Sequence, residues 1–257
     1  MSIPAHPRLK PRSQTIPALI SEMAARHPDR EAIVGGDQRL SFRTLEQQVE
    51  CVAAYLLEQG IRKGDKVGVL MGNLPEWIVA DFAITSIGAV MVAVNTWVTA
   101  RELGYVLEHS DTRLLITTGR FLRNDYRAMI DQLRTEKRLP MLERLLIVGS
   151  EPQAGELRWA DALRAPSPVA REQFERARSD VRPDDPAYIL YTSGSTALPK
   201  GVVVQHHGLV DNMWEIGQRQ HVTHEDRLWL AVSLFWGLGC ENALFNLFTP
   251  VSYTHLR

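Results

Sequence analysis

The residue types best suited to chemistry are concentrated in residues 191–201, which read Tyr-Thr-Ser-Gly-Ser-Thr-Ala-Leu-Pro-Lys-Gly. A polyphosphate needs many hydrogen-bond donors in a small volume. This stretch supplies side-chain hydroxyls, backbone N–H groups freed by a glycine, and one ammonium group. The predicted phosphate-binding residues are Thr192, Ser193, Gly194, Ser195, Thr196, Lys200 and Gly201. The sequence therefore predicts a site for the phosphates of a nucleotide.

Two other interpretations of this stretch are weaker. A Walker P-loop has glycine directly before its lysine and a hydroxyl residue after it, whereas here Pro199 precedes Lys200 and Gly201 follows it. A mononucleotide-switch mechanism is therefore disfavoured. A flexible turn between two strands is the other alternative, but the composition of the stretch and its apolar flanks favour the phosphate site.

The elements that must position this loop are short apolar strands alternating with helices. Predicted strands cover residues 66–71, 89–94, 113–117, 145–149, 187–191, 202–204 and 228–232. Predicted helices run from an N-cap at Ser41 to a stop at Gly60, over 75–87, from a capping box formed by Thr99 and Glu102 through about His109, around 171–178, and after His207. Because the strands are apolar throughout rather than alternately, they indicate a parallel sheet covered on both faces. The predicted fold class is α/β, with stacked helices and mostly parallel sheets.

A loop-like composition between residues 150 and 186, rich in proline, predicts a junction between two sub-domains. Residues 1–15 are interpreted as a disordered lead-in and residues 16–185 as the first α/β sub-domain. Residues 186–250 are expected to begin a second sub-domain that carries the phosphate loop. Residues 251–257 are interpreted as a non-native tail, because they look like the translation of a sequencing adaptor.

The composition excludes several classes of function. The 29 basic and 30 acidic residues give a net charge of −1, so no global field favours nucleic acid or an anionic membrane. Residues 82–100 lack charged side chains, but their polar residues favour a buried helix end followed by a buried strand over a membrane span. Cys51 and Cys240 lack metal-type spacing, which indicates a reducing compartment and predicts a cytoplasmic location.

Two polar clusters are interpreted as structural. His221 and His224 have the spacing of a metal-binding pair on a helix, but no third ligand accompanies them, so a solvated helix terminus is favoured and no metal site is predicted. Asp184 and Asp185 are interpreted as the polar start of the loop before the next strand.

Residues 191–201 resemble the phosphate-binding signature of the adenylate-forming (AMP-binding) superfamily, which includes acyl-CoA synthetases, aryl-CoA ligases, luciferases and peptide-synthetase adenylation domains. Further segments resemble the same family in the same order: Ser41-Phe-Arg-Thr-Leu, Gly64-Asp-Lys-Val-Gly-Val, Asn73-Leu-Pro-Glu-Trp77, Gly88-Ala-Val and residues 95–107. Leu234-Phe-Trp-Gly-Leu-Gly239 resembles the segment beside the acyl pocket, which often carries histidine where this chain has Trp236. The resemblance covers residues 16–248.

The resemblance implies a two-step ligase. ATP and a carboxylic acid give an acyl adenylate and pyrophosphate, and then a thiol, usually coenzyme A, displaces AMP. The implied substrates and cofactor are ATP, Mg²⁺ and coenzyme A. The acyl-pocket candidates are Phe235, Trp236, Gly237 and Gly239. Ordinary core packing is the alternative for Phe235 and Trp236, as it is for Trp229.

The resemblance also predicts that the chain is the N-terminal portion of such an enzyme, because the family's ribose-binding aspartate and catalytic lysine belong to later segments. No catalytic residue is therefore assigned, and the chain alone is expected to be inactive. A peptide-synthetase-type adenylation protein and a non-catalytic nucleotide-binding module are the alternatives. Ala197 stands where the family usually has glycine, so the loop is strained there if its φ is positive and unstrained if its φ is negative.

Overall fold

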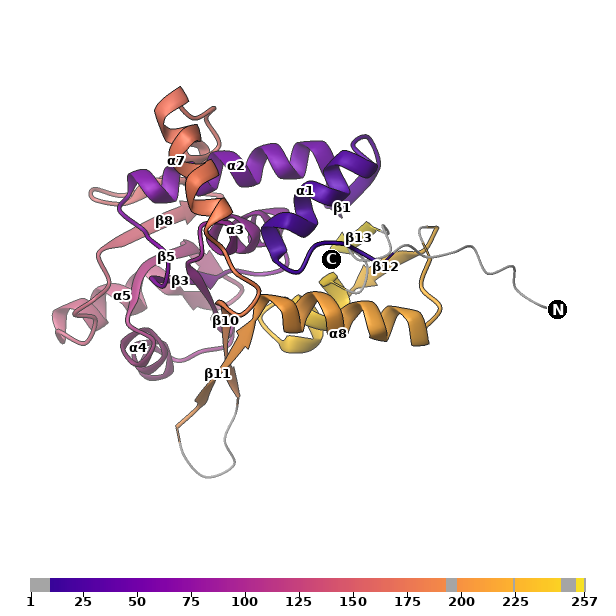
Figure 1. Cartoon of the computed structure of the whole chain (residues 1–257). Coiled ribbons are helices and arrows are strands. Elements are labelled where there is room, and N and C mark those ends of the chain that lie inside the picture. Colours follow the sequence, from indigo (N-terminus) through magenta and orange to yellow (C-terminus); the bar gives the residue numbers. More distant parts are fainter. Residues whose placement is uncertain (1–9, 193–197, 224, 246–252, 257) are drawn as a thin grey trace.

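A computed structural model describes residues 10–192, 198–223, 225–245 and 253–256 (Figure 1). A seven-stranded sheet has the order β11-β10-β4-β3-β5-β8-β9. Its strands are β3 (Lys66–Leu70), β4 (Val90–Ala93), β5 (Thr112–Thr118), β8 (Arg144–Val148), β9 (Leu157–Arg158), β10 (Pro186–Thr192) and β11 (Lys200–Gln205). All neighbouring strands are parallel except β10 and β11, which are antiparallel. The predicted α/β class with a mostly parallel sheet is confirmed.

Helices cover both faces of this sheet (Figure 1). One face carries α1 (Ile16–Arg26), α2 (Phe42–Glu58), α3 (Pro75–Ser86), α6 (Trp159–Ala162) and α7 (Pro168–Ser179). The other carries α4 (Ala100–His109) and α5 (Tyr126–Thr135). In β5, Leu114 and Ile116 belong to the first core and Leu115 to the second. Because alternate side chains enter two different cores, the strand is apolar at every position.

A second, four-stranded sheet has the order β12-β13-β1-β2. It contains β1 (Glu31–Gly35), β2 (Gln38–Ser41), β12 (Arg227–Leu230) and β13 (Tyr253–Leu256). The remaining elements are the small hairpin β6 (Arg120–Phe121) and β7 (Asn124–Asp125), α8 (His206–Arg219) and the π-helix η1 (Leu238–Ala243). All seven predicted strands occur, with ends displaced by one or two residues. The predicted N-caps Ser41 and Thr99 are confirmed, and Gly60, with φ of 86°, follows the end of α2.

Structural contacts occur at the predicted sub-domain boundary, in the predicted lead-in and in the predicted tail. The boundary at residues 185 and 186 separates no sheets, because β10 pairs with β4 in the larger sheet. Within the predicted lead-in, the backbone N–H groups of Arg12 and Ser13 donate to the Glu22 carboxylate. Within the predicted tail, β13 pairs with β1 and β12. The sub-domain division itself stays a prediction.

Residues 82–100 form the end of α3, a turn, the buried strand β4 and the approach to α4. The prediction of a buried helix end followed by a buried strand is therefore confirmed. Among the described residues, we find no helix with the length and apolar character needed to cross a bilayer.

Candidate functional site

The predicted phosphate loop joins β10 to β11 at one edge of the large sheet. Tyr191 pairs with Gly201 and Thr192 with Lys200. The Thr192 hydroxyl donates to the Lys200 carbonyl oxygen at 3.4 Å, and both side chains are exposed. Ser193, Gly194, Ser195, Thr196 and Ala197 lie outside the described residues. The structure thus places both ends of the predicted loop at the carboxyl end of β10, where open α/β sheets bind ligands.

Helix α4 supports the base of this hairpin. The Tyr105 hydroxyl donates to the Pro199 carbonyl oxygen at 3.0 Å, and His109 Nδ1 lies 2.8 Å from the Tyr191 hydroxyl. The Tyr105 and His109 ring centroids are 5.2 Å apart. Burial raises the pKa of Tyr191 to about 12, so its hydroxyl remains a donor at neutral pH. This support was not predicted from the sequence, although the aromatic side chains at 105 and 109 have the spacing of one helix face.

Gly201 has a packing role in the hairpin. A Cβ atom there would lie 3.0 Å from Ile189 Cγ2 and 3.5 Å from Tyr191 Cζ. The absence of a side chain therefore lets β11 lie close against the side chains of β10.

The predicted acyl segment lies beside the same strand. A Cβ atom at Gly237 would come within 3.7 Å of Leu190 Cδ1, two residues before Thr192. At Gly239 a Cβ atom would lie 2.9 Å from Leu234 Cα and would also collide with the Ser233 carbonyl oxygen. Glycine is therefore required for the tight turn of this segment. The structure brings the two predicted groups of site residues together along β10.

The aromatic residues of the acyl segment differ in exposure. Phe235 is buried in the main core, whereas Trp236 is 43% exposed and Trp229, on β12, is 58% exposed. The Phe235 and Trp236 ring centroids are 4.9 Å apart. Phe235 therefore anchors the segment, and Trp236 presents an aromatic surface next to it.

Buried polar groups lie on the elements that build this site. The Tyr188 hydroxyl donates to Asp81 Oδ2 at 2.7 Å, joining β10 to α3. Burial raises the pKa of both groups, which favours the protonated form of Asp81. On α8, His206 Nδ1 accepts from the Ile16 N–H at 3.2 Å, and burial lowers its pKa to about 4. His206 is therefore a neutral structural acceptor at physiological pH.

Within the described part of the chain, no group of three His, Cys, Asp or Glu side chains is placed so that it could hold a metal ion. His221 lies in the turn after α8 with φ of 56°, and His224 falls outside the described part. The Asp185 carboxylate forms an ion pair with Lys63 at 2.7 Å, and Asp184 Oδ1 lies 3.3 Å from His207 Nδ1.

A cavity of about 610 Å³ lies elsewhere, at the carboxyl ends of β5 and β8. Its two arginines already have carboxylate partners. Arg120 pairs with Asp125 at 2.6 Å and Arg127 with Glu156 at 2.8 Å. Because carboxylates of the protein neutralise these cations, the two arginines of the cavity offer no unpaired charge to a phosphate, and the β10–β11 hairpin stays the predicted phosphate site.

The fold and the hairpin define an adenylate-forming protein. Residues 20–249 match the family described as AMP-binding enzyme. The chain therefore belongs to this family. It is 31% identical over 239 residues to the putative acyl-CoA synthetase YngI of Bacillus subtilis, covering 88% of this chain and 44% of that protein. It is 33% identical over 241 residues to the acyl-CoA ligase SID4 of Ajellomyces capsulatus, covering 91% of this chain and 41% of that one.

Solved structures show the same architecture. The apo structure of MbtA from Mycobacterium smegmatis matches with a TM-score of 0.82 and 26% identity, covering 95% of this chain and 44% of that chain. The anthranilate CoA ligase AuaEII in complex with anthranoyl-AMP matches with a TM-score of 0.77 and 24% identity, covering 93% and 44%. The chain thus has the N-terminal fold of adenylate-forming enzymes and spans less than half the length of these relatives.

Proposed function

We propose that this chain forms the N-terminal part of an ATP-dependent acyl-CoA synthetase, an AMP-forming acid–thiol ligase. The observation that carries the proposal is the meeting of two segments along β10. Thr192 and Lys200 close the phosphate hairpin at the carboxyl end of β10, and a Cβ atom added at Gly237 of the acyl segment would lie 3.7 Å from Leu190 Cδ1. A nucleotide phosphate and a carboxylate bound by these segments would be neighbours, as adenylation requires.

In the first step, a carboxylate oxygen attacks the α-phosphorus of ATP, the bond to the β-phosphate oxygen breaks, and pyrophosphate leaves. Negative charge moves onto the departing group. The Lys200 ammonium and the hydroxyls of Thr192, Ser193, Ser195 and Thr196, with the Gly194 N–H, are proposed to hold the phosphates and stabilise that charge. In the second step a thiol sulfur, proposed to be that of coenzyme A, attacks the acyl carbon and AMP leaves.

The described residues fit Mg²⁺ only as a partner of bound phosphate. They contain no cluster of three acidic, histidine or cysteine ligands, and Thr192 offers a single hydroxyl oxygen at the hairpin. Phosphate oxygens of ATP would therefore supply most ligands of the ion, which prefers oxygen donors and retains water. When bound, Mg²⁺ would neutralise phosphate charge beside Lys200.

The proposed location is cytoplasmic. Cys51 and Cys240 are free thiols, as expected in a reducing compartment. A relative from Danio rerio, 31% identical over 221 residues, is named a mitochondrial medium-chain acyl-CoA ligase, so a fusion to a fluorescent reporter would decide between the two compartments.

The proposed function is tested with a full-length ligase that carries this chain. A panel of short, medium, long and aromatic carboxylic acids is supplied with ATP and Mg²⁺, and acid-dependent exchange of labelled pyrophosphate into ATP is measured. AMP release is then followed with coenzyme A or with a phosphopantetheinyl carrier protein as thiol. Exchange with at least one acid and coenzyme-A-dependent AMP release support the proposal. Carrier-dependent release supports a peptide-synthetase-type protein, and no exchange with any acid contradicts both.

The 257-residue chain alone is predicted to form no thioester. Its hairpin is proposed to bind phosphate, but the family resemblance assigns the ribose-binding carboxylate and the catalytic lysine to segments beyond those matched here. The measurement is AMP release by the isolated chain with ATP, Mg²⁺, coenzyme A and the acid accepted by the full-length ligase. Sustained, acid-dependent AMP release by the chain would contradict this division of labour.

A further inference from the structure

The side chain of Asn73 joins the carboxyl end of β3 to the start of the acyl segment. Asn73 Nδ2 donates to the Val232 carbonyl oxygen at 2.9 Å, and the Leu234 N–H donates to Asn73 Oδ1 at 2.8 Å. One amide thus satisfies a backbone acceptor and a backbone donor two residues apart, as a neighbouring β-strand would. The contact is partly buried and spans about 160 residues of sequence, so it fixes tertiary rather than local structure.

The backbone held by Asn73 is also the base of the tight turn that carries Phe235 and Trp236. The Trp236 N–H donates to the Ser233 carbonyl oxygen at 3.2 Å, and the Gly239 N–H donates to the Trp236 carbonyl oxygen at 2.8 Å. Gly239 packs directly onto Ser233 and Leu234. A shift at 233–234 would therefore move the whole turn.

Helix α3, which follows Asn73 in the chain, is also hydrogen-bonded to β10, the strand that leads into the phosphate hairpin. Helix α3 begins at Pro75 and is buried at every position except Glu76. In its middle, Asp81 accepts the hydrogen bond from Tyr188 of β10, four residues before Thr192. A buried helix has little freedom to move, so α3 fixes the position of the acyl segment relative to that of β10.

We propose that Asn73 is a positioning residue for the carboxylate side of the site. Its amide fixes the backbone at Val232 and Leu234, and thereby holds Phe235 and Trp236 at a set distance from β10 and the phosphate hairpin. Asn73 acts through that backbone and does not touch the reacting atoms. The inference rests on the proposed function, because it assigns the 234–239 segment to the carboxylic acid.

The variants separate the two halves of the amide. Asn73→Ala removes both hydrogen bonds. Asn73→Asp keeps an acceptor for the Leu234 N–H but sets an oxygen against the Val232 carbonyl, so it should have part of the effect. Asn124→Ala is the matched control, because the Asn124 amide donates at 2.9 Å to the Thr96 carbonyl oxygen, outside the acyl segment.

The first measurement is hydrogen exchange of backbone amides in the 257-residue chain, which needs no catalytic activity. In Asn73→Ala, exchange of the Leu234 amide and of peptides covering 232–240 should accelerate by about tenfold, with Asn73→Asp between it and the parent. Peptides from β3 and β10 should stay within about twofold of the parent, which shows that the fold is retained. Unchanged exchange in 232–240, or equal acceleration throughout the chain, would overturn the proposal.

The second measurement uses pyrophosphate exchange by the full-length ligase. Asn73→Ala should raise the KM for the carboxylic acid by about three- to tenfold and leave the KM for ATP within about twofold. Asn124→Ala should change neither. An equal rise in both KM values, or a fall in kcat alone, would overturn the positioning role. A parent enzyme without acid-dependent exchange would instead contradict the proposed function. The failure of the positioning role and the failure of the proposed function are thereby distinguished.

Discussion

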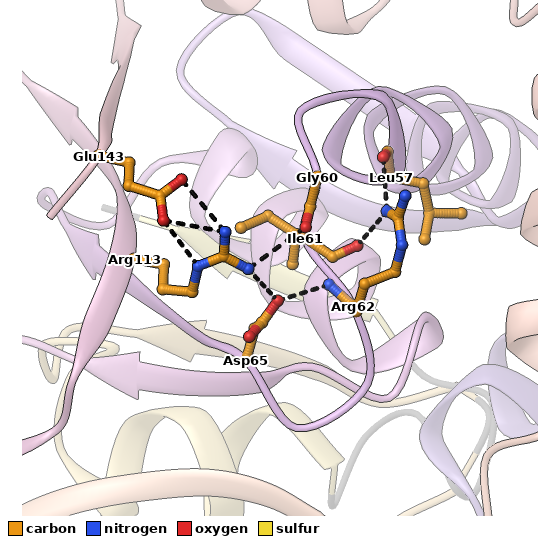
Figure 2. Close-up of polar contacts among 7 residues, drawn as sticks. All are labelled: Leu57, Gly60, Ile61, Arg62, Asp65, Arg113 and Glu143. Carbon is orange, nitrogen blue, oxygen red and sulfur yellow. Dashed lines mark hydrogen bonds and ion pairs between the residues drawn. The ribbon is translucent and has the colours of Figure 1, made fainter. Parts of the chain in front are cut away.

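In the seven-stranded sheet, the amino ends of the parallel strands form one side, here called the amino edge, and their carboxyl ends form the other, here called the carboxyl edge. Polar residues are used in opposite ways at the start of β3, β5 and β8 and at the β10–β11 hairpin. At the amino edge, where β3, β5 and β8 begin, Arg113 of β5 connects the loop before β3 to Glu143, the residue before β8 (Figure 2). Its Nη1 lies 2.6 Å from Asp65 Oδ2, and its Nε and Nη2 lie 3.0 and 2.9 Å from Glu143 Oε1. Asp65 Oδ2 also accepts from the Arg62 N–H at 2.7 Å. These charged groups are satisfied by one another.

Along the carboxyl edge, the polar side chains at the β10–β11 hairpin face outward. Thr192 and Lys200 are exposed, and Lys200 forms no ion pair with another residue in the described part of the chain. Trp236 is also partly exposed there. The difference indicates a division of roles: the amino edge stabilises the fold through internal charge pairing, and the β10–β11 hairpin leaves the Lys200 ammonium available for a ligand.

The largest predicted effect is at the carboxyl edge. Lys200→Ala should lower acid-dependent pyrophosphate exchange by about 10- to 100-fold, because a charge-assisted hydrogen bond to phosphate is lost. The melting temperature should remain close to that of the parent, since Lys200 is exposed. Exchange kinetics and thermal unfolding are measured on the same preparation. An exchange rate within about twofold of the parent would remove Lys200 from the phosphate site.

The opposite pattern is predicted at the amino edge. Arg113→Met should lower the free energy of unfolding by about 1–2 kcal/mol, because Asp65 and Glu143 lose their shared partner while the methionine keeps part of the packing. Affinity for ATP, measured by calorimetry, should not change. Urea unfolding gives the stability, with Arg123→Met, an exposed arginine of the β6–β7 turn, as control. A loss of ATP-binding free energy as large as the loss of unfolding free energy in Arg113→Met would contradict the assignment of separate roles to the two edges.

The elements of the fold were readable from sequence wherever local pattern determines local structure. Continuous apolar runs gave the strands, and the Thr99 and Glu102 capping box, with N–H to Oε2 of 2.8 Å, gave the start of α4. Helices α1 and α5 were missed although signals were present. Asp125 caps α5, and its buried residues Tyr126, Ile130 and Leu133 follow helical spacing. The pairing of β13 with β1 joins distant segments and has no local signature.

The same limit explains what was missed at the site. The loop chemistry at Lys200 was visible because its residues are consecutive. The Asn73 contact with Leu234 and the Tyr105 contact with Pro199 join residues 161 and 94 positions apart. Only the folded sheet brings these partners together, so no single-sequence spacing rule could identify them.

The smallest predicted effect concerns Asp81, which accepts one hydrogen bond from Tyr188 of β10, while its Oδ1 has no partner within the described part of the molecule. Because burial raises the pKa of Asp81, the folded chain keeps this proton to higher pH than the unfolded chain. The unfolded carboxyl ionises near pH 4, so above that pH the wild-type chain loses stability as pH rises toward the folded pKa.

Asp81→Asn removes this titration and keeps an oxygen that accepts from Tyr188. The variant should match the wild-type stability, or fall below it, at pH 4, and should exceed it at pH 7.5 by on the order of 1 kcal/mol, about 2–4 °C in Tm. His206, whose pKa burial lowers to about 4, destabilises both proteins alike as pH falls below about 6.5, so it cancels in the difference. Tyr188→Phe, which removes the donor, should be less stable than wild type at both pH values. Calorimetric melting of the three proteins decides the matter: an Asp81→Asn difference that is equal at pH 4 and 7.5 would show that Asp81 is not held neutral in the folded chain.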